Sequence, residues 1–226
     1  MTAYNAILFT HIFAGTIALA AFWTAATLRK GSGAHRLVGR TFLIAMTAVA
    51  ITGVGIAVAA FSRGKPVFGT FLIYLVLITS AACWLAWRAV RDKHDFKRFT
   101  GPVYRALAWA LIVTGAVMLV LGIRAEQLII GALSAVGLIG GPAMLRFARS
   151  QPTSRQWWLA RHYIFILGAG VATHIAFLNI GLTRLLPPEL GTMAQRLSWF
   201  APFAIALLAR WWLDRKYGPR RALAPL

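Results

Sequence analysis

Seven apolar segments, separated by shorter polar and basic stretches, follow one another along the chain. Each is close to the length of about 20 residues that an α-helix needs to cross the hydrocarbon core of a bilayer. The pattern predicts an all-α fold, a polytopic transmembrane bundle of seven helices in a single integral membrane domain over residues 1–226. The predicted helices are Tyr4–Leu28, Thr41–Ser62, Gly69–Val90, Val103–Ile123, Leu128–Phe147, Trp158–Leu182 and Leu197–Leu213.

The composition favours a membrane protein over a soluble one. Hydrophobic residues make up 59% of the 226 residues and charged residues 13%, whereas soluble domains average about 45–50% and about 25%. The single cysteine, Cys83, lies in an apolar segment, which excludes a disulfide framework or a cysteine-rich metal cluster. The first helix is not expected to be a cleaved signal peptide, because its apolar part is too long and Arg29 and Lys30 follow it.

Basic residues are distributed unevenly between two sets of connectors. Of the 24 Lys and Arg residues, 19 lie in the connectors after the first, third and fifth predicted helices, in the C-terminal tail, or at the helix ends that adjoin them. Because basic loops stay in the cytoplasm, this alternation predicts an outside N-terminus and a cytoplasmic C-terminus. Most tryptophans also fall toward the predicted inner helix ends, where indole rings favour the membrane interface. Topology thus explains the charge, and we expect membrane lipids rather than nucleic acid as partners.

Two stretches of the chain resemble a known family. HIFAGTIALAAFWTAATLRKGSGAHRLVGRTF, from His11 to Phe42, has a histidine ahead of a glycine-containing helix face and then a basic, glycine-rich turn. Together with Trp158–Phe177, which ends in ATHIAF, it resembles the bacterial predicted membrane proteins of domain of unknown function 2306. The resemblance covers about a quarter of the chain and implies a multi-pass protein of the bacterial inner membrane, with no particular activity. The matching motif positions are His11, His35, Arg36, Gly39, Arg40 and His162, whereas His174 departs from the family pattern.

Four histidines lie in or beside the predicted helices at two depths. At a rise of about 1.5 Å per residue, His11 and His174 lie about 10 and 12 Å below the outer helix ends, whereas His35 and His162 lie near the inner face. Neutral imidazole is an axial ligand of haem iron and binds other metals. The first hypothesis is therefore two cofactor-binding pairs, His11 with His174 and His35 with His162. Each pair is a candidate site for haem b or another histidine-ligated metal, and His11 with His174 is the candidate metal pair.

This hypothesis predicts a redox or electron-transfer membrane protein, with a quinone or another redox partner. One feature of the sixth helix bears on it, since His162 and His174 are twelve residues apart and therefore turned about 120° from each other. The two pairs would need different neighbouring helices. The structural alternative is that His11 faces another helix and bonds a Thr, a Ser or a backbone carbonyl there, while His35, His94 and His162 are interfacial residues.

Two polar segments are candidates for weaker interactions. RKGSGAHRLVGR mixes glycines with four basic residues that are candidate contacts for an anion or a lipid headgroup. The positive-inside rule explains the same charges without a ligand. In RDKHDFKR, Asp92 and Asp95 are expected to be salt-bridge partners rather than metal ligands. The four candidate headgroup contacts are Arg29, Lys30, Arg36 and Arg40.

Two further function classes remain open. The first is a transporter or channel for a lipid-soluble or small substrate, since all five carboxylates lie in connectors or at helix ends and leave no mid-membrane group for ion coupling. The second is a non-catalytic subunit that packs into a homo-oligomer or a larger membrane complex. No catalytic residue is assigned. Small residues predict close helix contacts at Gly53, Gly55, Gly115, Gly131, Gly137, Gly140, Gly168 and Gly170.

Overall fold

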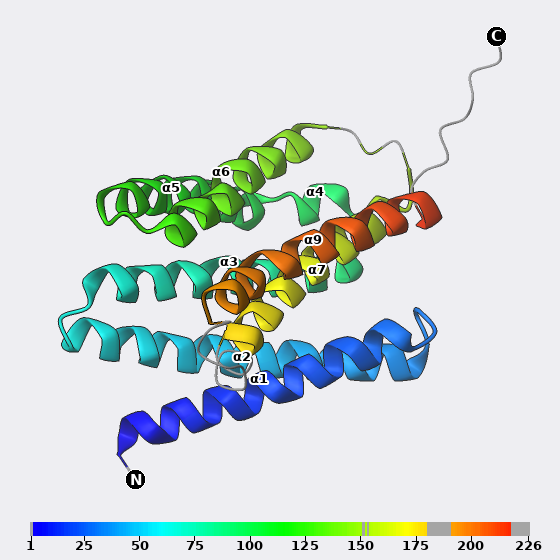
Figure 1. The fold of residues 1–226 in the computed structure, drawn as a ribbon. Coiled ribbons are helices and arrows are strands. Elements are labelled where there is room, and N and C mark those ends of the chain that lie inside the picture. The colour runs from blue at the N-terminus through cyan, green and yellow to red at the C-terminus, as the bar shows by residue number, and fades with distance from the viewer. Residues whose placement is uncertain (1, 151, 153, 180–190, 218–226) are drawn as a thin grey trace.

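The computed structural model describes residues 2–150, 152, 154–179 and 191–217 (Figure 1). All regular secondary structure in these ranges is helical, which confirms the predicted all-α fold. The helices are α1 Ala3–Thr27, α2 Gly33–Ser62, α3 Pro66–Arg91, α4 Phe96–Phe99, α5 Pro102–Arg124, α6 Leu128–Arg149, α7 Trp157–Phe177 and α9 Gly191–Tyr217.

Local sequence explains where several helices begin and turn. The Ser32 hydroxyl accepts a hydrogen bond from the backbone N–H of His35 at 3.1 Å and caps the start of α2. Pro66 opens α3, where its missing N–H costs nothing. Gly31 and Gly64 turn the chain between α1, α2 and α3 with φ of 79° and 68°, a left-handed conformation that glycine adopts without a steric penalty.

From α1 to α6 the helices run back and forth along a common direction, so that the connectors between them alternate between two ends of the bundle (Figure 1). The most extensive contacts are between α5 and α6, α1 and α2, α3 and α7, and α2 and α3. We call one end the basic end, because most Lys and Arg residues lie there. It holds the α1–α2 turn, the passage from α3 through α4 to α5, the start of α7 and the end of α9.

Six helical spans in the described residues are long and apolar enough to cross a membrane. They comprise α1, α2, α3, α5 together with the short α4, α6 and α7. The predicted seventh helix is present as α9, which is long enough but less apolar, because Ser198 and Pro202 interrupt its apolar run and Arg210 follows it. The chain is therefore a helical bundle of an integral membrane protein.

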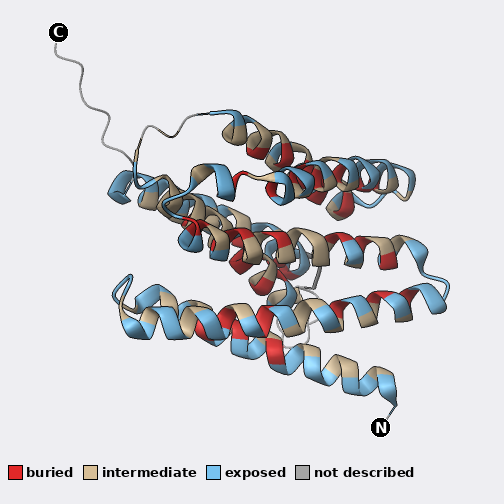
Figure 2. Cartoon of the chain, turned by 180° about the vertical axis from the view of Figure 1, so that it is seen from behind, coloured by how far each residue is buried: buried red, intermediate tan, exposed pale blue. Residues whose placement is uncertain are grey.

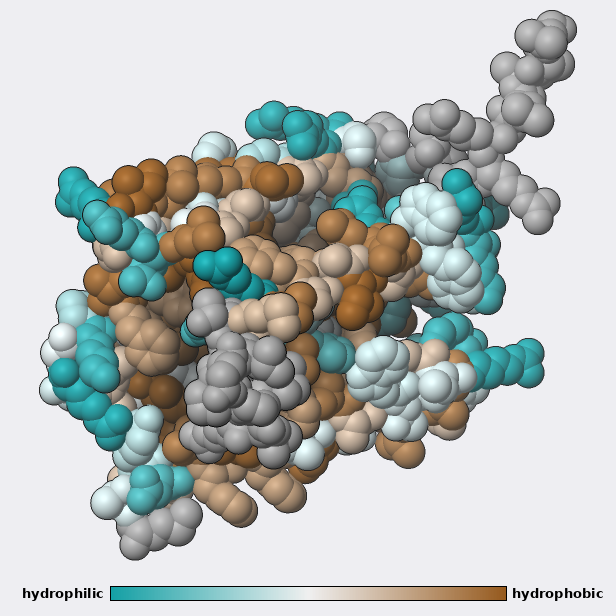
Figure 3. Space-filling model, viewed as in Figure 1, coloured by the Kyte–Doolittle hydropathy of each residue, from teal (hydrophilic) through white to brown (hydrophobic). Residues whose placement is uncertain are grey.

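Much of the outer surface of the bundle is apolar. Buried residues lie on the helix sides that face one another, and outward sides are exposed (Figure 2). Large apolar side chains such as Ile44 and Leu128 are 71% and 76% exposed. Hydrophobic residues dominate the middle of the visible face, and hydrophilic residues gather mainly toward its two ends (Figure 3). Soluble proteins rarely expose apolar surface so extensively, whereas lipid-facing helices require it.

Several predicted boundaries differ from the structure: α3 begins at Pro66 rather than Gly69, and α9 covers Gly191–Tyr217 rather than Leu197–Leu213. α2 begins at Gly33 and not at Thr41, so that Arg36 and Arg40 lie on a helix rather than in a loop. Long basic side chains on the first turns of a membrane helix can extend toward the headgroups, so their charge does not mark a helix end. α7 ends at Phe177, and residues 180–182 of the predicted helix lie outside the described residues.

The predicted glycine contacts are confirmed most clearly between α5 and α6. A Cβ on Gly115 would lie 3.0 Å from the carbonyl oxygen of Ser134, and one on Gly137 would collide with the carbonyl oxygen of Leu111. The backbones of these helices therefore touch directly. Nothing lies within 4 Å of the Cβ positions of Gly131, Gly140 and Gly168. The prediction is wrong for Gly140 and Gly168, whereas the backbone of Gly131 lies against Gly122.

Candidate functional site

His11 faces α2 from the first half of α1. Its Nδ1 lies 2.9 Å from the hydroxyl oxygen of Thr52, and that hydroxyl lies 2.7 Å from the carbonyl oxygen of Ala48. Because a carbonyl only accepts, Thr52 donates to Ala48 and His11 Nδ1–H donates to Thr52. Gly53 lies beside the ring, since a Cβ there would be in ordinary van der Waals contact with His11 Cε1 at 3.8 Å. The expectation that His11 faces a neighbouring helix and bonds a threonine there is confirmed.

His174 lies against α1, beside two aromatic rings. Its Nδ1 lies 2.7 Å from the carbonyl oxygen of Gly170, so Nδ1 carries the proton. Its Nε2 accepts a hydrogen bond from the indole N–H of Trp23 at 2.9 Å. The ring also packs edge-on against Phe22, with ring centroids 5.4 Å apart. Both nitrogens of His174 are therefore engaged by the protein itself.

The structure does not bring His11 and His174 together. His174 contacts Trp23, which is twelve residues from His11 along α1, a separation of about 18 Å. Counting residues from helix ends treats all helices as parallel and equally deep. In the structure α7 runs along α3 and meets α1 mainly near Phe22 and Trp23. The geometry therefore gives no support to a metal or haem site at this outer pair.

His35 lies at the basic end, on the first turn of α2. Its Nδ1 is 3.1 Å from the carbonyl oxygen of Ala25, near the end of α1. Lys30 donates to the carbonyl oxygens of Ala25 and Ala26 at 2.9 and 2.5 Å. Basic side chains commonly satisfy the last carbonyls of a helix in this way. Partial burial and the positive charge of Lys216 lower the pKa of Lys30.

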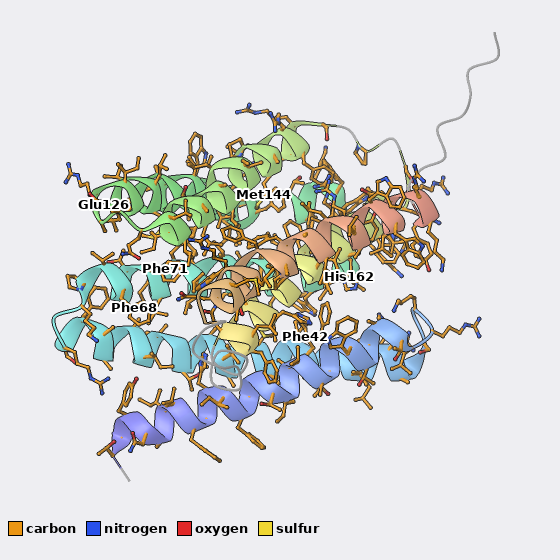
Figure 4. All side chains as sticks on the ribbon, in the orientation of Figure 1. Phe42, Phe68, Phe71, Glu126, Met144 and His162 are labelled. Atoms are coloured by element: carbon orange, nitrogen blue, oxygen red, sulfur yellow. The ribbon has the colours of Figure 1, made fainter. Side chains whose placement is uncertain are left out.

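His162 lies on the second turn of α7. Its Nδ1 lies 3.0 Å from the carbonyl oxygen of Ala86 on α3. Figure 4 places its side chain toward the basic end, away from Glu126 at the other end of the bundle. The ring lies within electrostatic range of His35 and Lys30. The structure thus brings the predicted inner pair, His35 and His162, into one neighbourhood.

The inner pair shares one protonation pattern. In both rings Nδ1–H donates to a backbone carbonyl, so the neutral form keeps its lone pair on Nε2. No hydrogen bond to either Nε2 is present among the described residues. Metal-binding histidines are commonly oriented in this way, with the second ring nitrogen held by a carbonyl. In the neutral form both rings therefore have an unprotonated Nε2 that no described residue contacts by a hydrogen bond, in contrast to His174.

The other predicted polar residues are divided between structural and exposed roles. Asp92 is buried and pairs with Arg88 and Arg98, which confirms its expected role as a salt-bridge partner. The Asp95 carboxylate caps α4 by accepting from the backbone N–H of Arg98 at 2.8 Å. His94 is exposed and makes no hydrogen bond or ion pair within the described part of the chain. The exposed candidate headgroup contacts are Arg29, Lys30, Arg36 and Arg40.

Sequence reasoning missed the backbone and aromatic partners of the histidines. Trp23 was interpreted only as an interfacial residue, although its indole N–H holds His174. The carbonyls of Ala25 and Ala86 give no sequence pattern, because every residue carries one. No group of three or more His, Cys, Asp or Glu side chains that could hold a metal ion occurs among the described residues.

Comparison with known proteins gives no match. No family model matches the chain, and neither a curated protein nor a solved structure matches it. The functional proposal therefore rests on the geometry of the histidines and their partners.

Proposed function

We propose that this integral membrane protein is an electron-transfer protein with a bis-histidine centre at its basic end, formed by His35 and His162. The observation that carries the proposal is the matched orientation of the two rings. Each Nδ1–H is held by a backbone carbonyl of a neighbouring helix, which leaves both Nε2 lone pairs available. A purely structural histidine needs only one such bond, whereas two neighbouring rings with the same free nitrogen suit a shared ligand.

Haem b is the group that this donor set fits best. His35 and His162 would hold the haem iron through their two imidazoles, because the porphyrin provides the other four nitrogen ligands. A bare metal ion such as zinc or copper takes three or four protein ligands, and no group of three candidate ligands occurs in the described residues. When bound, haem iron would accept and donate single electrons. His35 and His162 would hold it as neutral ligands, and the positive charge of Lys30 lies near His162. A membrane quinone is the redox partner that we propose.

The visible spectrum of the purified protein tests this function. We expect the reduced protein to show the sharp bands of six-coordinate bis-histidine haem, which both His35→Ala and His162→Ala abolish. His94→Ala is the matched control, because His94 lies at the same end but is exposed, and it should leave the bands unchanged. His174→Ala should also retain them, since His174 Nε2 is already held by Trp23. A colourless protein without metal by elemental analysis would contradict the proposal.

The location that we propose is the bacterial inner membrane, with the basic end in the cytoplasm and the N-terminus outside. The positive-inside rule and the family resemblance of His11–Phe42 support it. Labelling with a membrane-impermeant maleimide tests the orientation in a Cys83→Ala background. A cysteine at Ser32 should resist labelling in intact cells and one at Gly64 should react, and the reverse pattern would overturn the orientation.

A further inference from the structure

A cationic group without a hydrogen-bond partner lies on the side of α7 that faces α5, α6 and α9. The Nε of Arg161 is buried and has no hydrogen-bond partner among the described residues. Its guanidinium carbon lies 3.7 Å from the ring centre of Phe147 on α6. A guanidinium has five N–H donors and stays charged in proteins, so burial without an acceptor is strongly unfavourable. Arg161 therefore requires a partner that the described chain does not supply.

A second unsatisfied polar group lies nearby. Tyr104 on α5 is 1% exposed, and its hydroxyl also has no hydrogen-bond partner in the described part of the chain. Tyr104 and Arg161 lie within electrostatic range of each other. Buried hydroxyls and guanidinium groups are satisfied in nearly all proteins. Two orphaned donors from different helices indicate a shared acceptor.

The carboxylate nearest to this pair is already engaged. Asp214 on α9 accepts a hydrogen bond from the Tyr163 hydroxyl and pairs with Arg210, whose Nε lies 3.5 Å from it. Arg161 interacts electrostatically with both Asp214 and Arg210. Two arginines therefore share one carboxylate, and the group formed by Arg161, Arg210 and Asp214 carries a surplus positive charge. The missing acceptor is consequently an anion.

The surroundings indicate what kind of molecule carries the anion. A shallow, open depression of about 400 Å³ lies on α9 and is lined by residues of that helix, which include Arg210 and Asp214. Its lining combines charged groups with the exposed apolar side chains of Leu207 and Trp211. Basic pockets between membrane helices at this depth suit anionic lipid headgroups.

We propose that Arg161 and Tyr104 bind a phosphate group, supplied by the headgroup of an acidic phospholipid that lies along α9. The guanidinium donates to phosphate oxygens, as arginine does in phosphate sites generally, and the tyrosine hydroxyl donates a further hydrogen bond. The site is separate from the residues of the redox centre and does not depend on it.

Thermal unfolding of the delipidated full-length protein, followed by tryptophan fluorescence, tests the proposal. Phosphatidylglycerol in mixed micelles should raise the Tm, and phosphatidylcholine should have a much smaller effect. Removing a hydrogen bond to a charged group should weaken the apparent affinity about 10- to 100-fold in Arg161→Gln, and losing a single hydroxyl bond should weaken it about 2- to 10-fold in Tyr104→Phe. Without lipid, Arg161→Gln should have a higher Tm than the native protein, because it removes a partly buried charge whose Nε has no hydrogen-bond acceptor among the described residues.

Arg149→Gln is the control for general attraction to acidic lipid, because Arg149 is an exposed arginine at the same end of the bundle. It should respond to phosphatidylglycerol like the native protein. Inorganic phosphate, added without lipid, distinguishes the sources of the anion. A response to free phosphate that Arg161→Gln abolishes supports the site with a soluble oxyanion as its ligand. Equal responses of Arg161→Gln, Tyr104→Phe and the native protein to both additions would overturn the proposal.

Discussion

The α5–α6 and α1–α2 hairpins solve the same problem, adhesion between helices in lipid, by different means. Between α5 and α6 the backbones touch, and a Cβ on Gly122 would lie 2.5 Å from the backbone nitrogen of Gly131. Between α1 and α2 small side chains such as Ala18 are buried, and a hydrogen bond from His11 to Thr52 crosses the interface. Lipid provides no hydrophobic force between helices, so close packing and polar contacts are the available sources of stability.

The two hairpins also differ in their relation to the histidines, because α5 and α6 contribute none to the proposed redox centre. α5 and α6 contain no histidine, and the hydroxyls of Thr114 and Ser134 donate to carbonyls of their own helices. The histidines of the other half lie on α1, α2 and α7, where their rings bond to neighbouring helices or to their own backbone. Backbone contact at glycines leaves no space for a ligand, whereas polar interfaces position groups that can bind one. We therefore expect substitutions in the two halves to have different consequences.

The largest effect is expected for Gly137→Ala in the α5–α6 contact. The added methyl group would collide with the carbonyl oxygen of Leu111, and backbone atoms cannot move aside as a side chain does. Overpacking of this kind costs about 1–3 kcal/mol. The free energy of unfolding in mixed detergent micelles measures it. Gly140→Ala on the same helix is the control and should change stability by less than about 0.5 kcal/mol, since nothing lies within 4 Å of its Cβ position.

A smaller effect is expected for Tyr74→Phe, which acts on the link between α3 and α6. The buried Tyr74 hydroxyl donates to the carbonyl oxygen of Leu133 at 3.0 Å and accepts from the N–H of Gly137 at 3.1 Å. These two groups are a donor and an acceptor four residues apart, so they can bond each other once the hydroxyl is removed. We expect a loss of about 1 kcal/mol in the same unfolding measurement. A loss as large as that of Gly137→Ala would show that the α5–α6 contact depends on this hydroxyl.

The smallest effect is expected at the α1–α2 interface. A double-mutant cycle of His11→Leu and Thr52→Val isolates the hydrogen bond between the two side chains, which should contribute about 0.6 kcal/mol and at most about 1.7 kcal/mol. The reduced spectrum should not change, because neither residue belongs to the proposed centre. Loss of the haem bands in His11→Leu with unchanged stability would instead indicate that His11 is a ligand of the haem iron.

The helices were predictable from sequence because the need for about 20 apolar residues leaves few alternatives. The start of α2 was not, since Arg36 and Arg40 were interpreted as loop residues although they lie on helical turns. Their side chains are exposed at the basic end, where charge does not interrupt a helix. Hydropathy therefore locates the membrane-embedded part of a helix better than its ends.

The candidate site was predictable only in part. Helical periodicity correctly turned His11 toward another helix, because it depends on one helix alone. The partner of His174 depends on how α7 crosses α1, and residue counting contains no information about that crossing. The carbonyls that hold His35 and His162 were equally invisible, since backbone acceptors are present at every position.

Chemical rescue is the measurement that tests the proposed centre most directly. His162→Gly should abolish the bis-histidine bands of the reduced protein, because it removes one axial ligand. Free imidazole should restore them by occupying the space left by the side chain. A merely structural role for His162 would give no such recovery. If the native protein binds no haem, or if His162→Gly retains the spectrum without added imidazole, the account of a redox centre at His35 and His162 is contradicted.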